Sequence, residues 1–182
     1  MDINFHIPDF INHCRLNLLL LTLMQQHPEY FREGVKIASV FGAFPPSLWN
    51  GGRNTVGVVD DEIIKQVTKA FNSRGVPFRF TFTNPLIEEK HLGDPFCNKV
   101  MRMCDNGLNE VIVLSPILEE YIRKNYPSYK ITSSTCKEIR NADELSAELE
   151  KDYHYVVLDY NWNNKFDELE KIKDKGRCEI LV

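Results

Sequence analysis

Five short apolar runs in this chain each end in a cluster of polar residues, and a helical stretch follows each cluster. A sixth apolar run covers residues 178–182, and no such cluster follows it. Repeated units of strand, polar tip and helix predict a parallel α/β fold. In such folds the ligand site lies where the strands end, so the pattern indicates the place of a site without naming its chemistry.

The predicted strands begin near residues 36, 77, 110, 129, 153 and 177. Residues 78–83 alternate strictly and put three phenylalanines on one face, which is typical of a strand. Between the strands, Asp60, Pro95 and Pro116 are suited to the first turns of helices, and either Asn141 or Asp143 to the start of a further one. Before the first of these strands, residues 9–29 predict one more helix.

Two parallel architectures fit this order, an open doubly wound sheet and a (β/α) barrel. Six strands suit the open sheet, but neither glycine-rich nucleotide fingerprint occurs in the chain. The polar face of Arg79, Thr81 and Thr83 favours a barrel interior. We therefore predict an α/β protein with about six βα-type strands in a partial or TIM-like barrel. Residues 1–35 would be an N-terminal helical segment and 36–182 the barrel, together one compact domain.

The composition excludes several function classes. The chain has 182 residues, with 22 Lys and Arg against 26 Asp and Glu, so a net charge of −4 gives no general attraction to nucleic acid or membranes. The apolar stretch 16–24 is shorter than the ~20 residues of a membrane span. The five cysteines form no close pairs, so we predict reduced thiols and no metal site. The expected location is cytoplasmic.

The first polar tip is the most distinctive one. Gly51 and Gly52 allow close approach of the backbone to a ligand, and Arg53 offers a planar fork for a carboxylate or phosphate. Trp49 lies beside them. The alternative is a solvated turn with a packing tryptophan.

The next two tips offer polar groups of ordinary kinds. Asn84 ends the second predicted strand and could orient a substrate amide, or it could simply form a turn before Pro85. His91 follows and is an acid–base candidate, although loop histidines are commonly solvated. Ser115 lines the third tip and equally suits a helix N-cap.

The fourth and fifth tips complete the candidate rim. Ser133 and Ser134 could hold an oxyanion or cap the next helix. Asp159 is the candidate general base, with Asn161 beside it as a ligand-binding residue. Asp159 could also cap the helix that follows.

Four segments carry a resemblance to a known family: RFTFTNPL, LNEVIVLSPILEEYIRKNYP, YKITSSTCKEIRN and DYHYVVLDYNWN. Over about residues 36–182 the chain resembles the collagenase-like bacterial proteins of peptidase family U-thirty-two. The resemblance implies a TIM-like barrel with its site at the strand C-termini. It carries over five site-lining positions: Asn84, Ser115, Ser133, Ser134 and Asp159.

The resemblance implies peptidase activity or a part in the hydroxylation of RNA bases or quinones. Some relatives bind an iron–sulfur cluster through cysteines that follow the sixth strand. No such segment follows residues 178–182 here, so the cofactor is left unknown.

Three functional hypotheses remain open. The first is an enzyme of the hydrolase type, or one linked to hydroxylation, that takes a small anionic or peptide-like ligand at the strand C-terminal rim. The second is a non-catalytic barrel remnant that binds a partner or forms a homo-oligomer through open sheet edges. The third is an RNA-binding accessory protein that stacks bases on Trp49, Tyr160 and Trp162.

Overall fold

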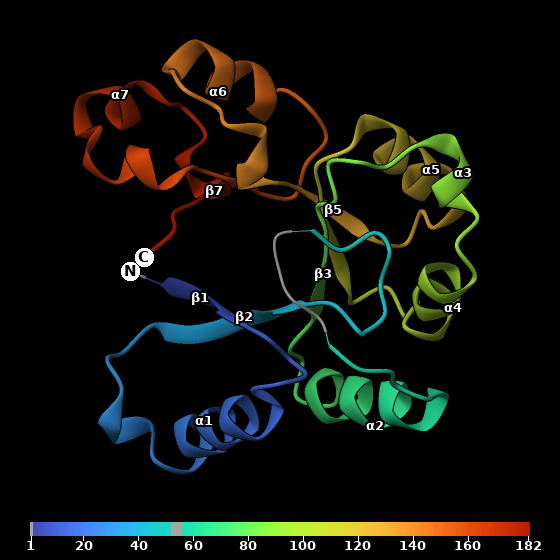
Figure 1. Cartoon of the computed structure of the whole chain (residues 1–182). Helices are drawn as coiled ribbons and strands as arrows, with labels where there is room; N and C mark the ends of the chain where they lie inside the picture. The colour runs from blue at the N-terminus through green and yellow to red at the C-terminus, as the bar shows by residue number, and fades with distance from the viewer. Residues whose placement is uncertain (1, 52–55) are drawn as a thin grey trace.

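The described residues form a sheet of seven parallel strands that follow one another in chain order, with β1 beside β2 (Figure 1). The structure is a computed structural model that describes residues 2–51 and 56–182. A parallel sheet wound in one direction curls toward a barrel with its helices outside. The strands are β1 (Ile3–Pro8), β2 (Val35–Gly42), β3 (Phe78–Phe82), β4 (Glu110–Val113), β5 (Lys130–Ser133), β6 (Val156–Val157) and β7 (Cys178–Glu179).

The predicted α/β fold with a partial barrel is confirmed, with one more strand than the six expected. The additional strand is β1, which pairs in parallel with β2. Segment 1–35 therefore holds the first strand of the sheet as well as a helix. Strand β1 has the sequence INFHIP, in which the polar residues Asn4 and His6 interrupt any apolar run. His6 points inward, where its Nδ1 lies 2.7 Å from Oγ of Ser39. The strand was therefore not predicted from the apolar pattern.

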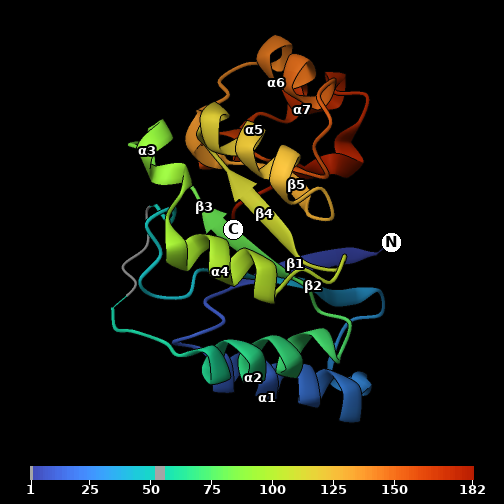
Figure 2. The ribbon, with the colours of Figure 1, turned by 90° about the vertical axis from the view of Figure 1, so that its right-hand side faces the viewer.

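The helices cover the outside of the curled sheet, with α1 and α2 against one end and α5 to α7 against the other (Figure 2). Their first turns follow the expected chemistry. Asp60 accepts a hydrogen bond from the backbone N–H of Ile63, and Asn141 from that of Glu144. The helices are α1 (Cys14–Gln26), α2 (Asp61–Asn72), α3 (Glu89–Leu92), α4 (Pro95–Met103), α5 (Pro116–Asn125), α6 (Ala142–Leu149) and α7 (Phe166–Lys171).

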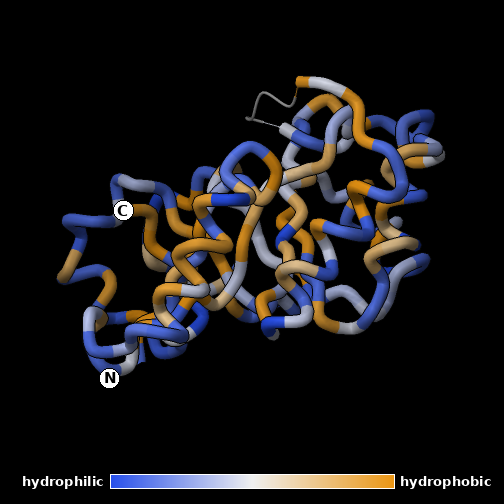
Figure 3. Tube along the Cα trace, turned by 90° about the horizontal axis from the view of Figure 1, so that it is seen from below, coloured by the Kyte–Doolittle hydropathy of each residue, from blue (hydrophilic) through white to orange (hydrophobic). Residues whose placement is uncertain are grey.

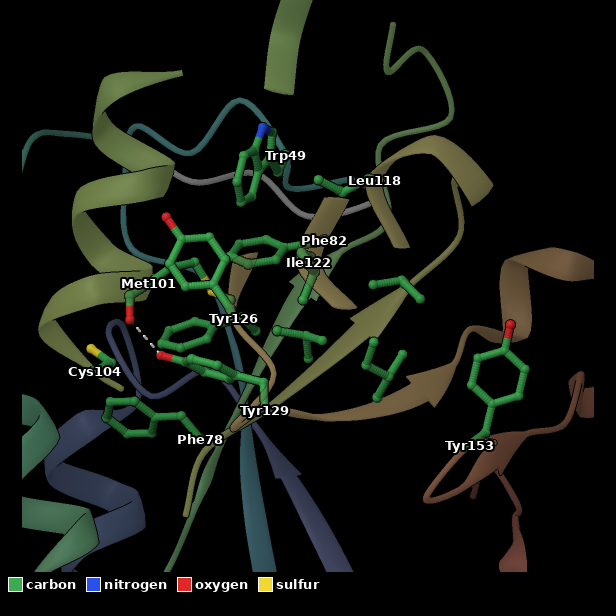
Figure 4. Packing of buried hydrophobic residues seen from close by; sticks show 14 of the residues in the cluster. Trp49, Phe78, Phe82, Met101, Cys104, Leu118, Ile122, Tyr126, Tyr129 and Tyr153 are labelled. Carbon is green, nitrogen blue, oxygen red and sulfur yellow. Dashed lines mark hydrogen bonds between the residues drawn. The ribbon is translucent and has the colours of Figure 1, made fainter. Parts of the chain in front are cut away.

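The main core lies between the sheet and these helices. Phe78, Phe80 and Phe82 of β3 share one face, as the alternation predicted, and all three are buried. The close-up in Figure 4 shows aromatic and aliphatic side chains packed around Phe78 and Phe82. Within this layer, the Tyr129 hydroxyl donates to the carbonyl of Met101 at 2.7 Å, which satisfies a buried polar group.

The barrel is incompletely closed. Among the described residues, hydrogen-bonded pairing ends at β1 on one side and β7 on the other. Side chains bring the two edges together, because His6 Nε2 lies 3.8 Å from the carboxylate of Glu179. Open edges of this kind are what the oligomer hypothesis requires. Self-association stays a prediction.

None of the described helices has the length and apolar character needed to cross a membrane. Along the chain, hydrophobic and hydrophilic residues alternate over short distances (Figure 3).

A polar cluster lies outside the barrel, between β5 and α6. The carboxylate of Glu148 accepts hydrogen bonds from Ser133 at 2.6 Å, Lys137 at 2.8 Å and Lys151 at 2.5 Å. Burial alone would raise the pKa of Glu148. The three hydrogen bonds outweigh that effect and lower the pKa from 4.5 to about 2.

This cluster predicts a contribution of Glu148 to acid unfolding. The folded state binds the proton less readily than the unfolded state, so stability present above pH 4.5 is lost as the pH falls toward about 2. Urea unfolding across this window is expected to show a shallower pH dependence for Glu148→Gln than for the wild type. Glu170→Gln, at an exposed position, is the matched control. An unchanged slope in Glu148→Gln would contradict the assignment.

Candidate functional site

A cavity of about 390 Å³ opens where the parallel strands end. This is the edge at which barrels of parallel strands bind ligands, and the volume lies within the usual range for small-molecule sites. Apolar atoms form most of the wall surface, and polar groups lie among them. The described lining residues are Phe41, Gly51, Thr81, Thr83, Ile112, Ser134, Thr135, Cys136, Val157, Glu179 and Leu181.

Three threonine hydroxyls at the cavity donate their hydrogen bonds to other groups of the protein. Thr81 donates to the side-chain oxygen of Asn50, and Thr83 to the carbonyl of Gly51, both at 2.9 Å. Thr135 donates to the carbonyl of Leu158 at 3.1 Å. A hydroxyl has one proton and two lone pairs, so each of these groups retains only acceptor capacity for a ligand.

A buried ionic cluster crosses the barrel interior and ends at the cavity. The Arg79 side chain is fully buried, and its Nε donates to Glu110 at 2.9 Å. Its Nη1 donates to Glu179, the residue of β7 that lines the cavity. The guanidinium also lies 4.7 Å from the ring centre of Tyr155. Paired charges of this kind are what a buried arginine requires.

Two histidines lie at the edges of this cluster. His6 approaches Glu179, and Nδ1 of His154 lies 3.0 Å from Glu110. Burial, reinforced by the positive charge of Arg79, lowers the pKa of His6 below its ordinary value of 6.5. His6 therefore takes up a proton less readily than a free histidine.

Of the sequence-predicted site residues, Gly51 and Ser134 line the cavity. Gly51 lies tight against β3, where an added Cβ would collide with the backbone of Thr83. The hydroxyl of Ser134 accepts from the backbone N–H of Cys136 at 3.1 Å, which leaves its own proton available. Gly52 and Arg53 lie outside the described residues.

Other predicted residues have structural partners instead. Trp49 is fully buried, and its indole N–H donates to the carbonyl of His91 at 2.8 Å. The His91 ring accepts from the backbone of Glu88 at the start of α3. Asn84 donates to the carbonyl of Leu48 at 2.8 Å and accepts from the backbone that follows it. None of these three predicted residues is among those that line the cavity.

The remaining predicted residues also lie away from the cavity. Ser115 caps α5, and Ser133 points outward to Glu148. Asp159 accepts from the backbone of Asn161 at 2.8 Å. These two residues border a separate surface hollow of about 560 Å³ beside Trp162.

Glu179 was not predicted as a site residue, because it lies within the largely apolar run 178–182. The polar face of Arg79, Thr81 and Thr83 was predicted, but no partner was predicted for Arg79. The period-two alternation of β3 was the available signal, since it placed a charged side chain inside the barrel.

The described residues contain no group of three His, Cys, Asp or Glu side chains arranged to hold a metal ion. The cysteines of this part of the chain are free; Cys97 and Cys104 are buried, whereas Cys136 is exposed at the cavity. Burial raises the pKa of Cys97 to about 12 and that of Cys104 to about 11. The raised pKa values of these two buried thiols do not suit metal ligation, which needs the thiolate form.

The tight position of Gly51 gives a direct test of the cavity rim. Gly51→Ala is expected to lower the free energy of unfolding by about 1 to 3 kcal/mol, because the new methyl group has to displace backbone. Gly93→Ala is the matched control, since nothing lies within 4 Å of a Cβ there. Urea unfolding of both variants measures the difference. Equal stability of the two would show that Gly51 does not set the rim.

The fold and the cavity together define a parallel (β/α) barrel, partly closed, with a ligand-sized cavity at its carboxyl end. The structure is similar to that of the U32 peptidase Mk0906, with a TM-score of 0.59 and 13% sequence identity. The alignment covers 99% of this chain and 66% of that chain, so this chain spans about two thirds of its length. The expected distant likeness to U32 proteins is confirmed at the level of the fold. No protein-family model and no curated protein sequence matches the chain.

Proposed function

We propose that this chain binds a small peptide-like molecule in the cavity at the carboxyl end of its barrel. The observation that carries the proposal is the hydroxyl arrangement, because Thr81, Thr83 and Thr135 present acceptors to the cavity. The amide N–H groups of a peptide are the matching donors. The apolar wall around Ile112 and Val157 suits an apolar side chain of the ligand.

The alternative ligand class is a small anion. That expectation depended on Gly52 and Arg53, which lie outside the described residues. An anion needs donors, whereas the protons of the three threonines are already used within the protein. Among the hydroxyls of the described lining, only that of Ser134 keeps its proton available. The described part of the cavity therefore supports a peptide-like ligand over an anionic one.

We propose that the cavity binds a ligand, and we propose no hydrolysis of that ligand. The structurally similar protein is described as a peptidase, but the likeness is one of fold. The predicted catalytic residues Asp159 and His91 bond to their own neighbours and do not line the cavity. A base acting on a ligand in this cavity would have to be within hydrogen-bond reach of it.

The test uses N-acetyl-L-leucinamide, a neutral molecule with amide donors and an apolar side chain. Titration at millimolar concentration is expected to shift the methyl NMR signals of Ile112, Val157 and Leu181. Signals of Leu16 and Leu19 on α1 are expected to stay in place. Absence of any shift in the cavity methyls would overturn the proposal.

A pair of blocking variants checks the location. Cys136→Trp places a large side chain at the exposed rim and is expected to abolish the shifts. Leu86→Trp adds the same bulk at a position that is 75% exposed and is not among the cavity-lining residues. Equal binding by both variants would place the ligand elsewhere on the protein.

A further inference from the structure

Glu179 is the feature of the cavity that the proposed function leaves unused. It is the only described lining residue with a charged side chain, and that side chain is 13% exposed. One of its oxygens, Oε2, receives the hydrogen bond from Arg79. A carboxylate has about four lone-pair sites, so acceptor capacity remains after this bond.

Two carboxylates and one guanidinium meet around Glu179, with His6 beside Glu179 and His154 beside Glu110. Arg79 carries one positive charge and shares it between the carboxylates of Glu110 and Glu179. His6, the other neighbour of Glu179, has a pKa lowered by burial and by Arg79, so it takes up a proton less readily than a free histidine. The described cavity lining adds no cationic side chain. Negative charge in a poorly solvated interior favours a cation beside it.

The threonine hydroxyl oxygens at this end of the barrel also suit a cationic ligand. An ammonium group has three donors and no acceptor. The oxygens of Thr81, Thr83 and Thr135 offer acceptors, in addition to the carboxylate of Glu179.

We infer that the cavity selects ligands that carry a free ammonium group, and that Glu179 is the residue that determines this specificity. The inference rests on the proposed function and names the charge of the ligand. It predicts that a peptide-like molecule with a free amino group binds better than its blocked counterpart.

The competing possibility is that Arg79 binds a carboxylate group of the ligand. Its Nη2 is buried and has no hydrogen-bond partner. However, Arg79 is fully buried and is not among the residues that line the cavity, so the ligand faces Glu179 instead. A buried polar group of this kind is commonly satisfied by an ordered water.

Three probes of similar size separate these choices. L-leucinamide carries an ammonium group, N-acetyl-L-leucinamide is neutral, and N-acetyl-L-leucine carries a carboxylate. NMR titration on the wild-type chain at pH 7 is expected to give about tenfold tighter binding of L-leucinamide than of the neutral probe. The anionic probe is expected to bind most weakly.

The outcomes keep the two proposals apart. If the neutral probe binds and L-leucinamide gains nothing, the ammonium inference fails and the cavity remains a peptide-like site. If none of the probes shifts the cavity methyls, the proposed function itself fails. If N-acetyl-L-leucine binds most tightly, the ammonium inference fails and Arg79 is the residue that determines the preference.

A variant then tests the residue. Glu179→Gln keeps the shape of the side chain and removes its charge, and it is expected to erase the preference for L-leucinamide over the neutral probe. Glu168→Gln on α7 is the matched control, because its carboxylate is not among the cavity-lining groups. A preference that survives in Glu179→Gln would overturn the assignment. The wild-type comparison of probes keeps the inference testable if this variant folds poorly.

Discussion

Replacing Arg79 with methionine is expected to lower the free energy of unfolding by about 3 to 5 kcal/mol. Methionine has a similar length and fills most of the space, so the main loss is electrostatic. The carboxylates of Glu110 and Glu179 would lose their buried cationic partner. Removing one member of a buried ion pair leaves the other charge desolvated and uncompensated.

Urea unfolding followed by circular dichroism measures this effect. Arg32→Met replaces an exposed arginine and is expected to change stability by less than about 0.5 kcal/mol. Adding Glu110→Leu and Glu179→Leu to Arg79→Met removes the uncompensated charges and is expected to recover stability. A loss below about 1 kcal/mol in Arg79→Met would show that the cluster is solvated and not buried.

The second large effect is expected for Phe80→Ala, with a loss of about 3 to 5 kcal/mol. Phe80 is fully buried in the main core between the sheet and the helices. Its ring stacks on that of Phe82 at 5.5 Å between centres and meets the ring of Phe10 edge-on at 5.9 Å. Truncation removes apolar contacts and leaves a cavity that rigid neighbours fill only in part.

Phe166→Ala serves as the matched control, because Phe166 is 66% exposed at the start of α7. Its truncation is expected to cost less than about 1 kcal/mol. Chemical unfolding of both variants under one set of conditions gives the comparison. Similar losses at the two positions would mean that the aromatic layer collapses around the missing ring.

Local patterns were sufficient for most of the fold. The strict alternation around Phe78 predicted β3, and the side chains of Asp60 and Asn141 predicted two helix starts by their capping chemistry. These signals are local because backbone conformation and capping depend on near neighbours. Strand β1 was missed for the converse reason, since its inward His6 becomes favourable only beside Ser39, a distant residue.

The candidate site was less accessible to such reasoning. Every strand tip offered polar residues, yet only Gly51 and Ser134 of the predicted set line the cavity. Polar residues at tips also cap helices, as Ser115 does, and both roles require the same side chains. Residue type alone therefore does not separate a binding residue from a cap.

The sequence by itself determined the class of the fold, a parallel α/β barrel whose site lies at the strand ends, because periodicity and turn chemistry are local properties of the chain. Only the tertiary structure decided which groups meet there. Arg79 and Glu179 are 100 positions apart, and their pairing depends on the curl of the whole sheet. The charge that Glu179 brings to the cavity follows from that pairing, because the pKa of a carboxyl group depends on its burial and on its partners.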